Sequence, residues 1–282
     1  MTVTGDAVDA DPVPRRGPAA RTLRPTITTW PLWIITAGMP LAYVVGVHGF
    51  VWCLPGLVLG ARILSRPSVR FPVSTIPLVA FLGWILLSMS MLRSPEAFAL
   101  FGYRWLLFAG ALTTLVWLVN VSEQKVPTAL VVDWLAVLWI ILVAFGYLGI
   151  LFPNLSTASP FQLALGPIGR VGFVDELARW RFAETQGFLG YPLPRPSAPF
   201  NATNGWGAAV AILSPFFVRS WIVQPDRRRR RVGYLLGLAA VYPIVVSVNR
   251  GLWVSLAVGL TYFSARKALR GRFAALGVLV VA

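Results

Sequence analysis

The amino-acid sequence predicts an all-α, polytopic transmembrane helix bundle of about eight spans plus the start of a ninth, with the N-terminus in the cytoplasm. Hydrophobic residues make up 57% of the 282 residues and charged residues only 12%, whereas about a quarter of a soluble domain is charged. The mean hydropathy is +0.71. The apolar residues form long blocks between short polar connections, which is typical of spanning helices and not of alternating barrel strands. These observations exclude an ordinary soluble enzyme and a disordered chain.

The polar segment 1–28 is predicted to be a disordered cytoplasmic tail, followed by one transmembrane domain over residues 29–282. Four prolines in the tail disfavour a helix. The first apolar stretch begins too late for a signal peptide, and no cleavage pattern follows it.

Apolar blocks predict the first four spans. Residues 30–64 would extend about 50 Å as one helix, which is too long for one span and suits two short ones. We expect the tight turn between them at residues 47–49. Residues 72–92 predict the third span, and residues 98–119 the fourth, interrupted only by Arg104.

The pattern changes after the fifth span, which we expect over residues 128–152 with Asp133 near its start. Residues 153–200 are polar and rich in proline and glycine, and they predict a long outer loop. Within it, residues 174–188 fit a short amphipathic helix with acidic residues at its N-terminus. Residues 202–221 predict the sixth span.

Five consecutive arginines, from Arg227 to Arg231, precede the predicted seventh and eighth spans at residues 232–248 and 252–265. Residues 273–282 begin a ninth apolar run that contains only ten residues, and a span needs about 20. We therefore expect the chain to be the N-terminal portion of a longer protein, with a transmembrane domain that is incomplete at its C-terminus.

The basic residues predict the orientation. With the N-terminus inside, cytoplasmic segments hold seventeen Lys and Arg residues and outer segments hold five, as the positive-inside rule requires. Most of the net charge of +15 is therefore a topology signal, and we expect no nucleic-acid partner. The run from Arg227 to Arg231 should attract anionic lipid headgroups by about 1 kcal/mol per residue.

Two arginines within or beside spans are candidate functional residues, because a charge in the membrane is costly. Arg104 could line a cavity that opens outward, or its stem could reach the outer headgroups. Arg250, preceded by Asn249, should face the outer interface, where its planar guanidinium suits phosphate. The alternative for Arg250 is an anchor at a helix end.

A third candidate region, residues 195–207, joins the outer loop to the sixth span. Arg195, Asn201 and Asn204 cluster there with Thr203. Asn and Thr are ordinary N-cap residues, and a helix N-terminus also binds anions. Both interpretations stay open at this point.

No metal or cofactor site is expected. His48 is the only histidine and Cys53 the only cysteine, so neither a multi-histidine metal site nor an internal disulfide can form. Asp133 lies near the cytoplasmic end of its span, where we expect it to be solvated.

Two short motifs resemble the O-antigen ligase and polymerase family of bacterial envelope proteins. The first is an Arg followed by Phe and Asn before a span, with a proline later in that span: Arg195, Phe200, Asn201, Asn204 and Pro215. The second, a Ser-Arg-Gly-Ala-Trp type sequence, here comprises Ser247, Asn249, Arg250, Gly251, Leu252 and Trp253. Asn249 stands where Ser is common in the family.

The resemblance implies a multi-pass protein of the bacterial inner membrane that transfers a glycan from an undecaprenyl-diphosphate carrier to an acceptor hydroxyl at the outer face, without metal or nucleotide sugar. It implies that Arg250 and Arg195 bind the diphosphate, and burial cost adds Arg104. Asn249, Asn201 and Asn204 would support them. The family's catalytic histidine would belong to a loop after residue 282, so no catalytic residue is assigned.

Two other functions remain open. A transporter or flippase for polysaccharide or lipid-linked glycan would need charges paired at mid-depth and discontinuous spans, whereas Arg104 and Arg250 are both predicted toward the outer side. A membrane scaffold without chemistry of its own is the third possibility.

Overall fold

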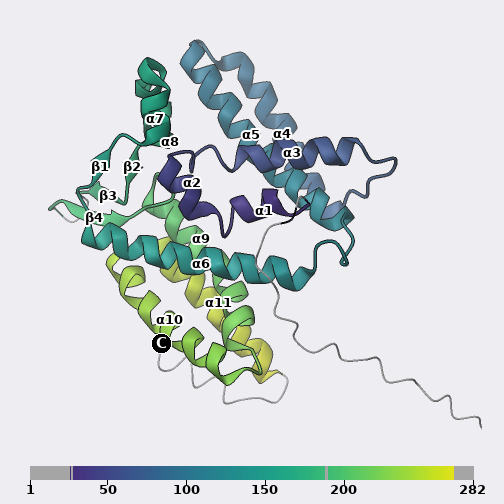
Figure 1. Cartoon of the computed structure of the whole chain (residues 1–282), viewed down its shortest axis with the longest axis vertical. Coiled ribbons are helices and arrows are strands. Elements are labelled where there is room, and N and C mark those ends of the chain that lie inside the picture. Colours follow the sequence, from purple (N-terminus) through teal and green to yellow (C-terminus); the bar gives the residue numbers. More distant parts are fainter. Residues whose placement is uncertain (1–25, 27, 188–189, 270–282) are drawn as a thin grey trace, which may run out of the picture.

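The computed structural model describes residues 26, 28–187 and 190–269, and within them the chain is mostly helical, as predicted (Figure 1). Most of the predicted disordered tail and the predicted ninth span lie outside these residues. Four described helices are long and apolar enough to cross a membrane: Val73–Met91, Pro95–Asn120, Thr128–Leu151 and Thr203–Ile222. The structure therefore supports a helical membrane protein but not the predicted count of about eight spans.

The N-terminal apolar block forms three short helices, α1 (Trp30–Ile34), α2 (Met39–Val45) and α3 (Cys53–Leu64), instead of two spans. Prolines at the starts of α1 and α2 and the left-handed Gly46 after α2 interrupt the helical run. The 12 residues of α3 rise about 18 Å, less than the roughly 30 Å of a bilayer core. These breaks divide the apolar block into helices too short to cross a bilayer, so the structure does not support the two spans predicted here.

The third to fifth predicted spans are present as continuous helices. Helix α4 (Ile76–Ser88) is extended at both ends by 3₁₀ turns and is followed by α5 (Pro95–Asn120) and α6 (Thr128–Leu151). Helix α5 packs along α3 where two glycines meet, since a Cβ on Gly56 would lie 2.2 Å from the Gly110 Cα. Small residues allow such close backbone approach between membrane helices.

The described part of the predicted outer loop contains two small antiparallel sheets. Strands β1 (Ser156–Thr157) and β2 (Trp180–Arg181) pair with each other, as do β3 (Ala183–Gln186) and β4 (Leu193–Pro196). Two short helices lie between β1 and β2, α7 (Pro160–Ala164) and α8 (Gly172–Ala178). The amphipathic helix predicted over residues 174–188 is therefore wrong after Ala178, because strand pairing takes residues that a helix would have used.

The C-terminal described part comprises α9 (Thr203–Phe217), a π-helical turn (Val218–Ile222), α10 (Arg227–Val246) and α11 (Arg250–Ala268). Helices α10 and α11 match the seventh and eighth predicted segments but are not among the four long apolar helices. After its arginines, the apolar part of α10 is residues 232–246, which rise only about 22 Å. The uncharged part of α11 is similarly short.

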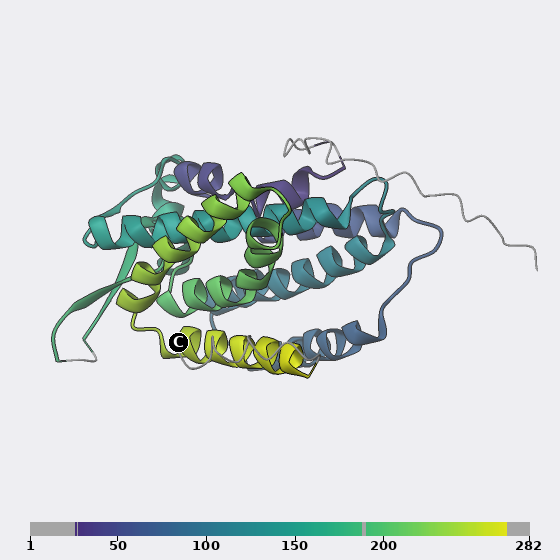
Figure 2. The ribbon, with the colours of Figure 1, turned by 90° about the horizontal axis from the view of Figure 1, so that it is seen from below.

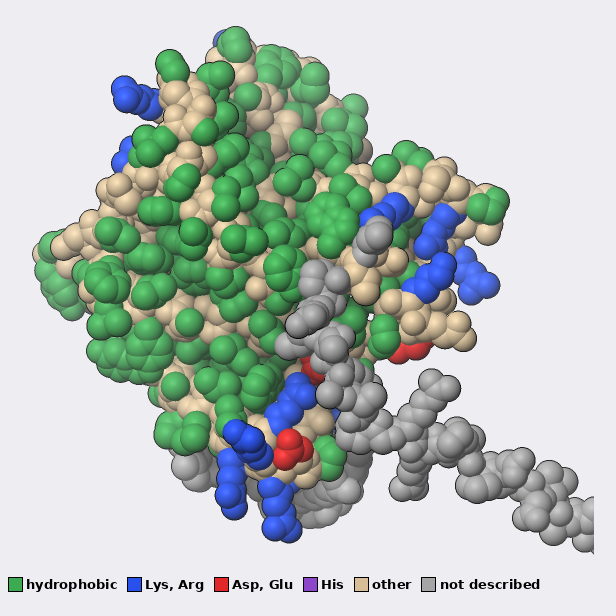
Figure 3. Space-filling model, viewed as in Figure 1, with side chains coloured by type: hydrophobic (Ala, Val, Ile, Leu, Met, Phe, Trp, Pro, Cys, Tyr) green, Lys and Arg blue, Asp and Glu red, His purple; other side chains and the backbone are tan. Residues whose placement is uncertain are grey.

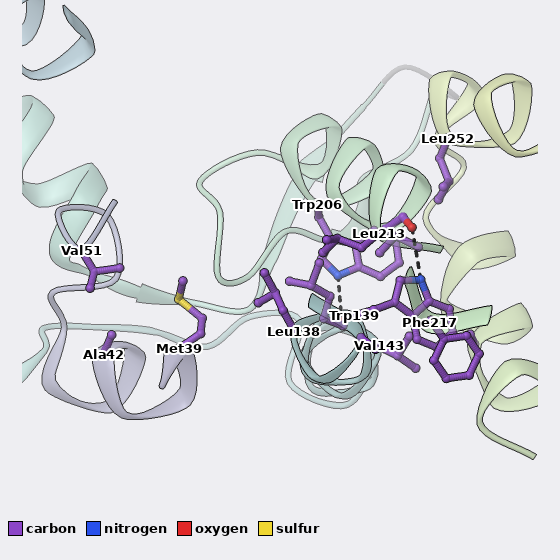
Figure 4. Close-up of a cluster of buried hydrophobic side chains, with 14 residues drawn as sticks. Met39, Ala42, Val51, Leu138, Trp139, Val143, Trp206, Leu213, Phe217 and Leu252 are labelled. Atoms are coloured by element: carbon purple, nitrogen blue, oxygen red, sulfur yellow. Dashed lines mark hydrogen bonds between the residues drawn. The ribbon is translucent and has the colours of Figure 1, made fainter. Parts of the chain in front are cut away.

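The main core lies between α6 and α9, with α10 and α11 packed against it (Figure 4). The Trp206 indole N–H donates to the Leu142 carbonyl at 2.9 Å, and the Trp139 indole N–H donates to the Val210 carbonyl at 3.2 Å. Each tryptophan thus buries a large apolar body while its single donor is satisfied. In Figure 2, α9 lies between α6 and α11, and it contacts both helices.

Two contacts join α5 to segments that the predicted topology places on the same side of the membrane as the contacting end of that helix. On the predicted cytoplasmic side, Arg66 donates to the Asn120 carbonyl. On the predicted outer side, the Tyr103 hydroxyl donates to the Gly49 carbonyl at 2.7 Å. On the face seen in Figure 3, apolar side chains cover the centre and basic ones gather at the margins.

Candidate functional site at the junction of α10 and α11

The junction between α10 and α11 is a three-residue turn, Ser247 to Asn249, that is held from several directions. Asn249 is buried, and its side-chain oxygen accepts from the Leu252 N–H at 3.0 Å, which caps α11. Its side-chain nitrogen donates to the Thr203 carbonyl at 3.0 Å. Asn249 therefore caps the start of α11 and also links the turn between α10 and α11 to the start of α9.

Two backbone features make this junction tight. Val248 has a φ of 46°, which is an outlier for a β-branched residue and persists only when its surroundings impose it. A Cβ on Gly207 of α9 would lie 2.2 Å from the Asn249 Nδ2, so only glycine allows the two helices to approach this closely. The turn is thus specified by its neighbours as much as by its own sequence.

Arg195 reaches the same junction from strand β4 and is only 5% exposed. Its Nε donates to the Ser247 carbonyl at 2.6 Å, and its Nη1 donates to the Gln186 side chain. Burial lowers the pKa of Arg195, and the neighbouring Glu184 carboxylate acts in the opposite direction. The guanidinium therefore joins the β3–β4 hairpin to the end of α10.

Glu184 also contributes to this junction, although no motif in the sequence marks it. It lies directly opposite Arg195 in the β3–β4 register. Its Oε2 accepts from the Thr203 N–H at 2.8 Å, at the start of α9, where the N-cap residue Ala202 provides no side-chain cap. A carboxylate from a distant hairpin thus occupies the position where a free helix N-terminus would bind an anion.

Arg250 differs from Arg195 in exposure. It is the first residue of α11, its side chain is exposed, and within the described part of the chain it makes no hydrogen bond or ion pair. Next to it, the Trp253 indole N–H donates to the Ile244 carbonyl at 3.1 Å. The junction therefore presents one exposed guanidinium on a well-anchored turn.

The other predicted site residues are less closely associated with the junction. Asn201 and Asn204 flank Thr203 and are both exposed. Arg104 is exposed on α5, which packs chiefly against α3. The structure thus brings Arg195 and Asn249 together beside Arg250, leaves Asn201 and Asn204 at the nearby surface, and places Arg104 on a separate part of the bundle.

The prediction that Asp133 is solvated is wrong. Its Oδ1 accepts from the Ser220 hydroxyl at 2.6 Å and from the Arg229 Nη2 at 2.9 Å, and its side chain is only 13% exposed. One arginine of the basic run turns inward, which a sequence-based topology cannot detect. The result is a second polar cluster at the N-terminal end of α10.

His48 is buried in the turn between α2 and α3, with its ring 4.6 Å from that of Tyr43. Its Nδ1 is buried without a hydrogen-bond partner in the described structure, and burial lowers the pKa of His48 to about 4. Among the described residues no cluster of His, Cys, Asp and Glu could hold a metal ion.

No protein-family model, curated protein or solved structure matches the chain.

Proposed function

We propose that the chain belongs to a glycan ligase or polymerase of the bacterial inner membrane, which transfers a polysaccharide from undecaprenyl diphosphate to an acceptor hydroxyl at the outer face. The observation that carries the proposal is Arg250, an exposed guanidinium without a partner among the described residues, on a turn fixed by Asn249. The motif resemblance at Arg195 and Asn249-Arg250-Gly251 adds the substrate class.

In this proposal, Arg250 binds the diphosphate of the carrier lipid. Its planar guanidinium can donate two parallel hydrogen bonds to phosphate oxygens. When the acceptor hydroxyl attacks the sugar, the bond from the anomeric carbon to the diphosphate breaks, and negative charge develops on the leaving oxygen. A fixed cation at that oxygen stabilises the transition state more than the ground state.

Arg195 takes a supporting role in the proposal, because it is buried and bonded to Ser247 and Gln186. It holds the turn that carries Arg250. Asn249 does the same by capping α11, while Asn201 and Asn204 offer exposed amides near the start of α9. Arg104, which is exposed on α5, is kept as a further candidate contact for the diphosphate, and no described residue is assigned as the base.

The decisive experiment replaces Arg250 by Gln and by Lys in the full-length protein. Transfer of glycan from a purified undecaprenyl-diphosphate donor is expected to fall by a factor of at least about 100, the usual cost of losing a key electrostatic group. Arg93→Gln removes another exposed outer-side arginine and serves as the matched control. Normal transfer by Arg250→Gln would refute the assignment of Arg250.

The alternative of a transporter is tested in the same preparation. Movement of a labelled lipid-linked glycan across a proteoliposome membrane, with no transfer product, would favour transport over transfer.

The proposal also requires the junction to face outward. In a Cys53→Ala background, Asn204→Cys should react with a membrane-impermeant maleimide in intact cells, and Pro225→Cys should react only after lysis. The opposite pattern would place the junction in the cytoplasm and exclude a diphosphate at the outer face.

A further inference from the structure

The five consecutive arginines at the start of α10 do not share one environment. Successive residues on an α-helix point about 100° apart, so five of them encircle the helix and one must face the bundle. That residue is Arg229, which bonds to Asp133 and Ser220 and lies 5.0 Å from the centroid of the Trp221 ring. Arg229 is therefore a contact between α10 and the rest of the bundle.

The other four arginines have no such partners. Three of them are exposed and Arg230 is half-buried, and their side chains make no hydrogen bond or ion pair with any part of the chain that the structure describes. We call this set the arginine collar; it comprises Arg227, Arg228, Arg230 and Arg231.

The position of the arginine collar is electrostatically unfavourable within the isolated chain. The N-terminus of a helix carries partial positive charge, so cations there are destabilising, and like charges three or four residues apart repel each other. Nearby acidic groups offset little of this, since Asp226 caps the Arg228 N–H at 2.9 Å and Asp133 is taken by Arg229. External anions would remove the conflict.

The surface next to the arginine collar is strongly apolar. One to two turns further along α10, Tyr234, Leu235 and Leu238 are all more than half exposed. Just before the helix, Val223 is exposed as well. A dissolved polyanion would leave these side chains in water, whereas a lipid supplies a phosphate for the arginines and acyl chains for the apolar side chains.

We propose that the arginine collar binds the phosphodiester headgroups of anionic phospholipids, while Arg229 serves only to attach α10 to α6. The inference does not depend on glycan transfer, because it concerns the other end of α10 and a different ligand. It predicts that neutralising collar residues weakens lipid binding and that neutralising Arg229 weakens the fold.

The test uses titration calorimetry to measure the affinity of the full-length protein, in a neutral detergent, for phosphatidylglycerol and for phosphatidylcholine. Each collar arginine removed should lower the apparent affinity for phosphatidylglycerol about fivefold, so R227Q/R228Q should lower it about 25-fold. The charge-matched control R93Q/R170Q removes two exposed arginines outside α10 and should leave the affinity unchanged. Phosphatidylcholine affinity should be the same in all variants.

Further arms separate the other outcomes. Arg231→Gln alone should weaken phosphatidylglycerol binding about fivefold and carries the test if the double variant fails to fold. Arg229→Gln should lower thermal stability and keep most of the lipid affinity. Equal losses in R227Q/R228Q and R93Q/R170Q, no loss in either, or displacement of the lipid by equimolar inorganic phosphate or single-stranded polynucleotide would overturn the proposal.

Discussion

The two ends of helix α10 are each held by an arginine, but in opposite electrostatic settings. At the C-terminal end, Arg195 comes from the outer loop and donates to the Ser247 carbonyl, where the helix dipole is negative and a cation is favoured. At the N-terminal end, Arg229 belongs to α10 itself and needs the carboxylate of Asp133. One end is satisfied within the chain, and the other leaves four arginines whose side chains have no hydrogen-bond or ion-pair partner among the described residues.

The comparison also separates two kinds of dependence on surroundings. The Arg195 end depends on the folding of a hairpin that is distant in sequence, and there the guanidinium donates to the Ser247 carbonyl and the Gln186 side chain beside the Glu184 carboxylate. The Arg229 end depends on an ion pair and on the solvent or lipid around it. Mutations should therefore act differently at the two ends.

The largest effect is expected for Arg195→Met. Removing the guanidinium leaves the Ser247 carbonyl and the Gln186 amide without their buried donor, which should cost about 3 kcal/mol. Thermal unfolding of the full-length protein in detergent measures the loss. Arg195→Lys keeps the charge but cannot donate in both directions at once. Its thermal stability should therefore lie between that of the wild type and that of Arg195→Met. Wild-type stability for Arg195→Met would show that the hairpin does not anchor α10.

A smaller loss, about 1–2 kcal/mol, is expected for Asp133→Asn. The amide still accepts from Ser220, but Arg229 loses its counter-charge, and partial exposure of Arg229 lets water compensate in part. The same unfolding assay applies, with a double-mutant cycle that combines Asp133→Asn and Arg229→Gln. Additive effects in that cycle would mean that the ion pair contributes nothing to the attachment of α10.

Asn249→Ala should cost about 1 kcal/mol through the lost cap on α11. Asn249→Asp keeps the cap but replaces the donor to the Thr203 carbonyl with a carboxylate oxygen that can only accept, so it perturbs the second contact without removing the first. In the transfer assay, the proposed role predicts that Asn249→Ala lowers activity more than Asn249→Asp does. Equal activity in both variants and wild type would argue against a positioning role for Asn249.

Substitution of His48 is expected to have the smallest effect on stability at neutral pH, and a distinct effect on stability in acid. Its pKa is lowered to about 4 in the folded chain from 6.5, so the folded state favours the neutral ring. That contribution is present above pH 6.5 and is lost as the pH falls toward 4, since the unfolded chain then binds more protons. The outer loop packs against this turn, because a Cβ on Gly46 would lie 2.0 Å from the Ser159 Oγ.

Acid should therefore loosen the Arg195 end of α10 before the Arg229 end. Hydrogen exchange at pH 7 and pH 5 can follow both ends, and His48→Phe should flatten the difference between the two pH values. An unchanged pH dependence in His48→Phe would assign the acid response to other groups. Asp175, whose pKa is lowered by its hydrogen bond to Arg179, titrates only at lower pH.

The sequence by itself determined the helical membrane class, the continuous helices from residue 73 to residue 151, and the helix that begins at Thr203. Long uninterrupted apolar runs determine these because a membrane-spanning segment must bond its own backbone within a helix. The two spans predicted over residues 30–64 are not supported, because Pro31, Pro40 and Gly46 interrupt the helix there. Apolar content alone does not reveal such interruptions.

Only the tertiary structure decided the site. Arg195 and Asn249 were candidates from their motifs, but their partners Glu184, Gln186 and Ser247 come from a hairpin and a helix end that no local pattern joins. The inward turn of Arg229 toward Asp133 is likewise invisible in a run of identical residues. The physical reason is common to both: a local pattern encodes which backbone can be buried, whereas the pairing of polar groups depends on which distant segments meet once the apolar faces have packed.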